Sequence, residues 1–215
     1  MNQYIREPIN TLTHLAGAVL AIFGLLAMLL KAVESAKSAA AIVAVVFFGL
    51  SMILLYSAST AYHMAIAKES VIRFLRKIDH SMIYVLIAGT YAPFCLITLE
   101  GVVGWSVFIV IMIAALAGIL FKMIWFKSPR WLSTAIYISM GWMIILAGGP
   151  LMQELAAPGF WLLVAGGILY TVGGIIYGFK PKFLEFKHFG YHEIFHIFIL
   201  LGSLAHFLSV YYFVL

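Results

Sequence analysis

Residues 190–215 read GYHEIFHIFILLGSLAHFLSVYYFVL and decide the fold. Beyond Glu193 this stretch carries no acidic or basic residue apart from histidine, and it is longer than the ~20 residues with which a helix crosses a bilayer. His192 and His196 lie four positions apart, so on a helix both imidazoles share one face, one turn apart. Polar residues inside a membrane segment are costly, and two histidines at this spacing can bind one metal ion. The stretch therefore predicts a transmembrane helix that carries part of a metal site.

The composition of the 215-residue chain is that of an integral membrane protein. Hydrophobic residues make up 65% and charged residues 10%, and the mean hydropathy is +1.10, which lies outside the range of soluble domains. The net charge is +5, but the basic residues lie in short gaps between apolar stretches. That distribution is typical of membrane topology, so we expect no nucleic-acid partner. The single cysteine, Cys95, excludes a disulfide within the chain.

Seven windows with little or no charge predict an all-α fold of seven transmembrane helices. The predicted spans cover residues 11–30, 39–63, 80–99, 102–124, 131–150, 159–179 and 191–215. We expect the first span to be retained, because it is too long for the apolar region of a secretory signal. No linker or repeat divides the chain, so residues 1–215 are expected to form one membrane domain.

The distribution of Lys and Arg predicts the orientation of the helices. Eleven of these residues fall before the first span, in the second, fourth and sixth loops or, for Lys122, at the adjoining end of the fourth span, whereas Lys31 and Lys37 fall on the other side. Basic residues are enriched in cytoplasmic loops of membrane proteins. The N-terminus is therefore predicted to be cytoplasmic and the C-terminus external.

Polar residues from three predicted helices share the cytoplasmic side. His63 closes the second span with Ser59 one turn deeper, Asp79 immediately precedes the third span, and His192 and His196 open the seventh. Three histidines would give Zn2+ three protein ligands and an open fourth position, which is the pattern of catalytic zinc sites. Such an ion lowers the pKa of a bound water to about 7 and polarises a carbonyl. Asp79 would act on that water as a general base or orient a ligand, and Ser59 would donate to the oxyanion.

Each of these residues also has a structural interpretation. His63 can be a hydrogen-bonding residue at the membrane interface, and Asp79 can be an N-terminal helix cap. Ser59 can donate to a carbonyl one turn back. The agreement in depth between residues from separate helices favours a common site.

The remaining histidines are assigned by depth. His206 lies ten residues beyond the HxxxH pair, about 15 Å deeper along a helix, so we expect it to be packed or bonded to water rather than to the same ion. His80 and His188 are expected at the membrane interface. His14 and Asn10 begin the first span, where they can support the site, although helix capping explains Asn10 equally well.

The segment HEIFH also matches the HExxH signature of metalloproteases, in which the glutamate, here Glu193, is the general base. Such enzymes usually need a further ligand later in the chain, and only His206 follows, at the wrong depth. Asp79 is the only aspartate in the chain and precedes the motif. An intramembrane protease therefore stays an alternative.

An ordered set of motifs runs nearly the full length of the chain: EPxNxxTH (7–14), SxxxH (59–63), Asp79, GTYAPF (89–94), and HxxxH (192–196) followed by HF (206–207). This set resembles the bacterial hemolysin III family, which is grouped with the adiponectin and progestin receptors (PAQR) and more distantly with alkaline ceramidases. The resemblance implies a multi-pass protein of the bacterial cell membrane, with zinc held by residues matching His63, His192 and His196. It also implies that Asp79 contacts a zinc-bound water, that Ser59 lies nearby, and that the glutamate of HEIFH is incidental.

Three functional hypotheses follow. The first is a zinc-dependent hydrolase that acts on an amide or ester of a membrane lipid and is linked to membrane lipid homeostasis. The second is a receptor-like protein in which zinc is structural and ties helices together. The third is a cytolytic, pore-forming hemolysin, against which the sequence shows no charge-lined helix suited to a channel. Membrane lipids are the expected partners in the first hypothesis.

Overall fold

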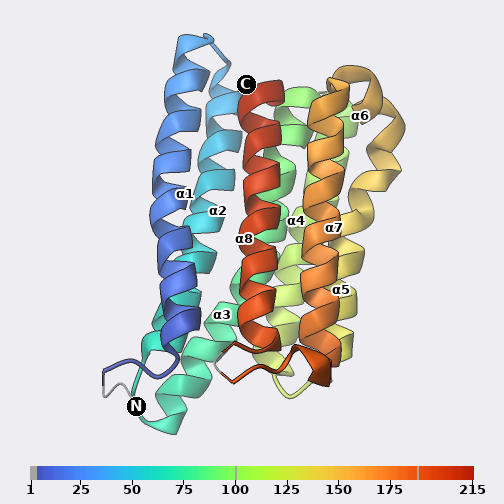
Figure 1. Cartoon of the computed structure of the whole chain (residues 1–215). Coiled ribbons are helices and arrows are strands. Elements are labelled where there is room, and N and C mark those ends of the chain that lie inside the picture. Colours follow the sequence, from blue (N-terminus) through green and yellow to red (C-terminus); the bar gives the residue numbers. More distant parts are fainter. Residues whose placement is uncertain (1–3, 100, 188) are drawn as a thin grey trace.

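The computed structural model describes residues 4–99, 101–187 and 189–215, and these residues form a helix bundle without any strand (Figure 1). In this described part, seven helical segments are long and apolar enough to cross a membrane: Pro8–Glu34, Ala39–Met64, Glu69–Thr98, Gly101–Ile124, Arg130–Glu154, Ala157–Phe179 and Tyr191–Val214. The predicted all-α fold with seven transmembrane helices is confirmed.

Four of the spans are single α-helices, namely α1 (Pro8–Glu34), α2 (Ala39–Met64), α4 (Gly101–Ile124) and α7 (Ala157–Phe179). The other three change helical type along their length. The third span is α3 (Glu69–Pro93) followed by a π-helical turn (Phe94–Thr98). The fifth joins α5 (Arg130–Trp142) through a 3-10 turn (Met143–Ala147) to α6 (Gly148–Glu154), and the seventh is α8 (Tyr191–Ser209) with a final π-helical turn (Val210–Val214). A 3-10 turn (Lys182–Leu184) lies between α7 and α8.

Pro93 accounts for the irregular end of the third span. Proline has no backbone N–H, so the Gly89 carbonyl loses its usual helical donor. The next residues form a π-helical turn, in which the Leu99 N–H donates to the Phe94 carbonyl at 2.9 Å. A π-turn of this kind accommodates an interrupted hydrogen-bond ladder.

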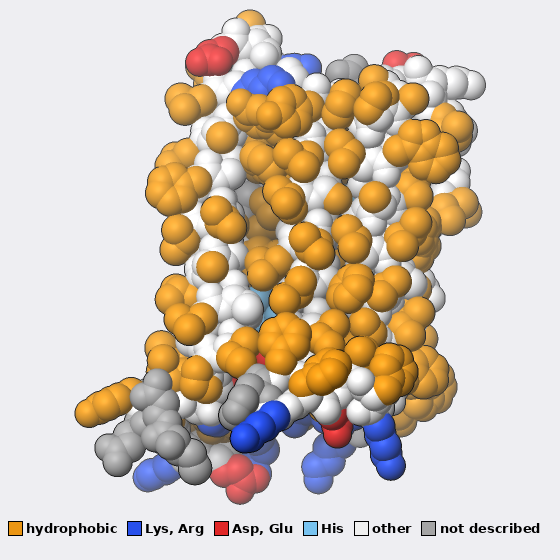
Figure 2. All heavy atoms as spheres, in the orientation of Figure 1, with side chains coloured by type: hydrophobic (Ala, Val, Ile, Leu, Met, Phe, Trp, Pro, Cys, Tyr) orange, Lys and Arg blue, Asp and Glu red, His pale blue; other side chains and the backbone are white. Residues whose placement is uncertain are grey.

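The last span lies between the first and the sixth: α8 packs against both α1 and α7, and the two chain ends lie at opposite ends of the bundle (Figure 1). Figure 2 shows apolar side chains covering the sides and Lys and Arg gathered mainly at the end that holds the N-terminus. Lys31 and Lys37 lie at the other end, where Lys31 donates to the Tyr211 carbonyl and Lys37 to the Val214 carbonyl. The positive-inside rule thus assigns the N-terminal end to the cytoplasm.

Two helix starts differ from the sequence prediction. α3 begins at Glu69 rather than at residue 80, so Asp79 lies well inside the helix and its interpretation as an N-terminal cap is wrong. The first turns of α3 carry Arg73 and Arg76, and a search for apolar windows does not detect a charged helical extension. Similarly, the N-cap position of α1 is Glu7, so Asn10 lies within the helix and does not cap it.

Candidate metal centre

The three predicted histidine ligands lie together. His63 is at the end of α2, and His192 and His196 are in the first two turns of α8. One ring nitrogen from each lies within 4.8 Å of the others, so the three residues could hold a metal ion. The Nε2 atoms of His63 and His192 are 3.3 Å apart. Two nitrogens bound to one tetrahedral zinc at about 2.0–2.1 Å are separated by roughly 3.3 Å, so this spacing fits a shared ion.

A carboxylate orients His63. The Oε2 atom of Glu7 lies 2.6 Å from His63 Nδ1, and the Glu7 N–H donates to the His63 carbonyl at 3.1 Å. Burial tends to raise the pKa of the Glu7 carboxyl, but the hydrogen bond and charge of His63 outweigh this effect and lower the pKa to about 2. An ionised Glu7 accepts from Nδ1–H, which leaves Nε2 of His63 free to bind a metal. A histidine ligand held by a carboxylate in this way is common in metal sites.

Thr13 has a similar relation to His196. The Thr13 hydroxyl donates toward the Ile9 and Asn10 carbonyls, each at 3.0 Å. Its oxygen can therefore accept from His196 Nδ1–H, which lies 3.4 Å away. This assignment leaves Nε2 of His196 unprotonated. The polar partners of both rings thus favour the tautomers that can bind a metal.

A second network joins the starts of α1 and α8. Asn10 Nδ2 donates to Glu7 Oε2 at 3.2 Å and to Glu193 Oε1 at 2.9 Å. The other oxygen of Glu193 accepts from the backbone N–H of the N-cap residue Gly190 at 2.8 Å. Both oxygens of Glu193 are engaged at the helix start, where the carboxylate has a structural role. This geometry does not support Glu193 as the general base of a protease.

Asp79 and Ser59 lie at the same level as the histidines. The Asp79 carboxyl lies beside the Ser59 hydroxyl and within electrostatic range of His63. Ser59 is 1% exposed, and both residues line a cavity that His192 and His196 also reach. The two sequence-predicted catalytic candidates are thus near the histidine cluster, and their roles stay predictions.

The other histidines have different surroundings. His14 stacks on His196 with ring centroids 3.6 Å apart and an interplanar angle of 8°, and within the described residues neither of its nitrogens has a hydrogen-bond partner. His206 donates from Nε2 to the Leu163 carbonyl at 3.2 Å, which fits a packed histidine. His80, which was expected at the membrane interface, lies inside α3 and lines the cavity. His188 lies outside the described residues.

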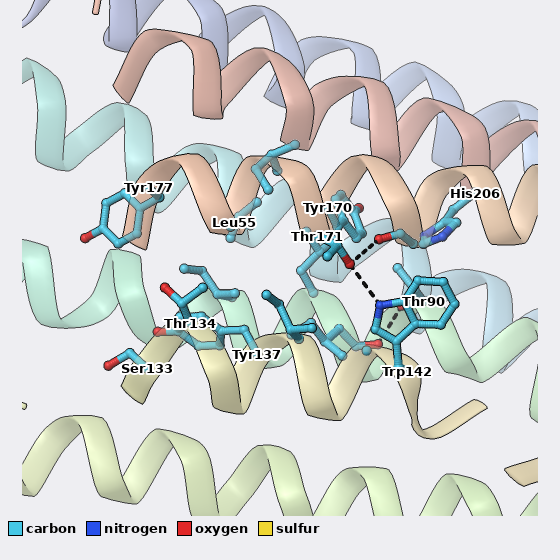
Figure 3. Close-up of a pocket in the computed structure, with 18 of the residues that line it drawn as sticks. Leu55, Thr90, Ser133, Thr134, Tyr137, Trp142, Tyr170, Thr171, Tyr177 and His206 are labelled. Carbon is cyan, nitrogen blue, oxygen red and sulfur yellow. Dashed lines mark hydrogen bonds between the residues drawn. The ribbon is translucent and has the colours of Figure 1, made fainter. Parts of the chain in front are cut away.

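The cavity has a volume of about 530 Å³ and a mostly apolar lining contributed by α2, α3, α5, α7 and α8. Ser133, Thr134 and Tyr177 lie near one end of it, and Trp142, Thr171 and His206 near the other (Figure 3). Trp142 Nε1 donates to Thr171 Oγ1 at 2.9 Å. The histidine cluster therefore opens onto a long apolar space within the bundle.

Known proteins identify the family. Residues 2–207 match the family model described as Haemolysin-III related. The chain belongs to the hemolysin III family. It is 43% identical over 216 residues to Hemolysin-3 of Bacillus cereus, covering all of this chain and 95% of the relative. It is also 44% identical over 207 residues to the Hemolysin-3 homolog of Bacillus subtilis (strain 168), covering 96% of this chain and 93% of the relative. Together with the seven apolar helices, this makes the chain a multi-pass bacterial membrane protein.

Sequence reasoning left the role of Glu7 open and did not identify Thr13. Both lie in the EPxNxxTH stretch, which was recognised as a motif, but the ring that each contacts is 56 or 183 residues away in the chain. Only the three-dimensional structure gives that pairing.

Proposed function

We propose that this hemolysin III protein is a zinc-dependent hydrolase that cleaves an amide or ester bond of a membrane lipid and takes part in membrane lipid homeostasis. The observation that supports the proposal most directly is the meeting of His63 with His192 and His196, two residues that line an apolar cavity. A purely structural cluster has no need of a ligand-sized space beside it. A hydrolase of lipids needs both a metal-binding cluster and a space beside it for the lipid.

Zinc is proposed because of the donor set. Three neutral imidazoles with no thiolate suit Zn2+ among the common cellular metals, although copper, iron and nickel also accept imidazole. Glu7 and Thr13 fix the ring tautomers that such an ion requires. When bound, zinc would polarise a carbonyl and increase the acidity of a water molecule.

Two residues near the cluster would then have separate catalytic roles. The Asp79 carboxylate would accept the proton of the attacking water and later deliver it to the leaving group. The Ser59 hydroxyl would donate a hydrogen bond to the carbonyl oxygen as its negative charge develops. Both side chains line the cavity beside the histidines, which is the position these roles require.

The cavity would hold the acyl chain. Its lining includes Leu55, Ile87 and Leu151, which offer an apolar wall that excludes water from the chain. Polar side chains lie toward both ends of it, among them Ser133 and Thr134 at one end and Thr171 at the other (Figure 3). Such a space fits a lipid whose reacting carbonyl is near the polar headgroup.

Replacing Asp79 by Asn tests the proposal. In metal-loaded protein, Asp79→Asn is expected to lower turnover by ~10²-fold or more, the usual contribution of a general base, while zinc content stays unchanged. Turnover is measured on a short-chain ceramide and on a diacyl ester lipid in mixed micelles, with Glu34→Gln as a control for loss of a carboxylate. Retained turnover would remove the role of Asp79. No turnover by the zinc-loaded wild type on either lipid class would overturn the hydrolase proposal.

One structural observation favours a metal that stabilises the fold instead. The cluster and its partner Glu7 connect the start of α1, the end of α2 and the start of α8. In that case metal binding energy becomes folding energy, and chelation should lower the melting temperature sharply. Metal-free protein that melts at the same temperature excludes this function.

The name Hemolysin-3 of the Bacillus cereus relative favours testing a cytolytic activity. Release of a dye from liposomes that contain the purified protein is the direct measurement. We expect no release, because in the described residues the cavity is lined mainly by apolar side chains rather than by a charged channel.

A further inference from the structure

Four basic side chains line the cytoplasmic end of the cavity; three of them come from separate helices, and the fourth, Lys127, is exposed in the loop before α5. Arg76 comes from α3, Lys122 from the last turn of α4, and Arg130 is the first residue of α5; all three line the cavity. Among the described residues, none of the three lies within 4.0 Å of a carboxylate oxygen, since the ion pairs found there are Arg6–Glu7, His63–Glu7 and Arg73–Glu69. These cations lack a partner of opposite charge.

Lys122 carries most of the argument, because it is only 4% exposed. Its Nζ donates to Ser133 Oγ at 2.9 Å and to Ser128 Oγ at 3.4 Å, and both acceptors are neutral hydroxyls. A buried ammonium without a counter-charge is unfavourable. A hydroxyl satisfies the hydrogen bond of such a group but does not balance its charge.

The other two cations make the local charge more positive. Arg76 and Arg130 are close enough for their charges to act on Lys122. Arg76 Cζ and Lys122 Nζ each lie 5.5 Å from the ring centre of Phe126, so they approach the same aromatic ring. Like charges gathered in a partly buried site repel one another. A bound anion would remove this repulsion.

The start of α5 points to the same conclusion. α5 begins at Arg130, has no side-chain cap and has no acidic residue in its first turn. The N-terminus of a helix carries a partial positive charge and free N–H groups, and oxyanions bind there readily. Ser133 belongs to this first turn and lines the cavity as well. The helix end and the three cations therefore favour the same kind of ligand.

The positive-inside distribution does not explain this cluster. It accounts for exposed basic residues such as Lys182, but not for a buried lysine that faces a cavity. Trp125 and Trp131 flank the cluster in sequence and are mainly exposed, and exposed tryptophans are enriched at the level of lipid headgroups. The anion available at that level is the phosphate of a phospholipid.

We propose that Arg76, Lys122 and Arg130 bind the headgroup phosphate of an anionic phospholipid from the cytoplasmic leaflet. The oxygens of one phosphate can accept from a guanidinium fork and from an ammonium at the same time. This site goes beyond the proposed hydrolysis and does not require it, because none of its three residues belongs to the histidine cluster. The charge of Asp79 acts on Arg76, but the two side chains do not form an ion pair.

The test is lipid binding by the detergent-solubilised full-length protein. Short-chain phosphatidylglycerol, short-chain phosphatidylcholine and inorganic phosphate are titrated separately, and bound lipid is counted by native mass spectrometry. Each basic residue at a membrane surface contributes about fivefold to the affinity for an anionic lipid. Lys122→Met is therefore expected to weaken phosphatidylglycerol binding by about fivefold or more. Lys182→Met removes an exposed lysine with the same charge that does not line the cavity. It is expected to change the affinity by less than about twofold, because in detergent that lysine faces no anionic membrane surface.

Every outcome bears on the proposal. Phosphatidylglycerol bound in preference to phosphatidylcholine, and lost in Lys122→Met, supports it. If inorganic phosphate binds as tightly as the lipid, the site is for a free anion. If both lysine variants lose affinity for phosphatidylglycerol equally, the electrostatic attraction is diffuse. Either result overturns the proposal. If Lys122→Met does not fold, Arg130→Gln replaces it, because Arg130 is only partly buried. Asp79→Asn should bind phosphatidylglycerol at least as tightly as the wild type does, because it removes a negative charge near Arg76, and this separates the proposal from that of hydrolysis.

Discussion

The two ends of α8 bury the same type of residue for different purposes. At the cytoplasmic end, His196 is 1% exposed, and its ring lies among His63, His192 and His14. At the outer end, His206 is 5% exposed and packs edge-to-face on Tyr170 with ring centroids 5.1 Å apart. Burial therefore does not distinguish a candidate metal ligand from a packing residue. What distinguishes them is whether other donor atoms face the same ring.

The polar partners of the two rings differ as well. His206 uses Nε2 as a donor to the Leu163 carbonyl, which takes that nitrogen away from any metal. At the cytoplasmic end, the Nδ1 atoms of His63 and His196 face Glu7 and Thr13, which keeps Nε2 of both rings available. A membrane helix can thus carry buried histidines at two depths while only one depth is suited to a metal.

The same substitution at the two positions should give opposite results for the metal. His196→Ala removes one of three ligands and is expected to weaken zinc binding by more than the ~10- to 100-fold that loss of an outer partner costs. His206→Ala should keep about one zinc per chain and lose about 1–3 kcal/mol of stability, because the Leu163 carbonyl loses its donor. Elemental mass spectrometry and thermal unfolding of the purified variants measure both effects.

Equal zinc content in the two variants would contradict the assignment of the cytoplasmic cluster as the metal centre. Absence of zinc from the wild type would reduce the cluster to polar packing between helices. The hydrolase proposal would then fail with it.

The carboxylate beside His63 provides a smaller and more specific change. Glu7→Gln keeps the shape of the side chain but removes the charge that fixes the tautomer of His63, so zinc affinity is expected to fall ~10- to 100-fold. Glu34→Gln, at the exposed outer end of α1, is the matched control and should leave affinity unchanged. Competition with a chelator of known affinity measures the difference. Equal affinities in the two variants would show that Glu7 only tethers the start of α1.

The fold was largely predictable from the sequence because the bilayer imposes one strong requirement. Each span must hold about 20 apolar residues and satisfy its own backbone, so hydropathy alone locates all seven segments. The start of α3 was not predictable in this way. The first turns of α3 are charged and precede the apolar window that predicted the span. For this reason the sequence placed Asp79 at the start of a helix rather than inside it.

The candidate site was predictable only in part, for a related reason. HxxxH and SxxxH lie on single helices, where spacing determines which side chains share a face. The contacts of Glu7 with His63 and of Thr13 with His196 join helices that are distant in the sequence. The cluster of Lys122 with Arg76 and Arg130 is likewise formed by three helices, and in the sequence it resembles ordinary positive-inside residues.

The outer end of α8 can be tested through two adjacent glycines of α7. A Cβ at Gly166 would overlap the His206 ring, whereas a Cβ at Gly167 would meet Trp142 at an ordinary 3.6 Å. Gly166→Ala is therefore expected to lose about 1–3 kcal/mol from overpacking, and Gly167→Ala to be neutral or to gain up to ~1 kcal/mol from helix propensity. Both should keep the wild-type zinc content, because the overlap is with a histidine outside the cluster of His63, His192 and His196. Loss of zinc in Gly166→Ala alone would mean that packing at the outer end of α8 is coupled to the cytoplasmic metal centre, and the two ends could not then be treated as independent.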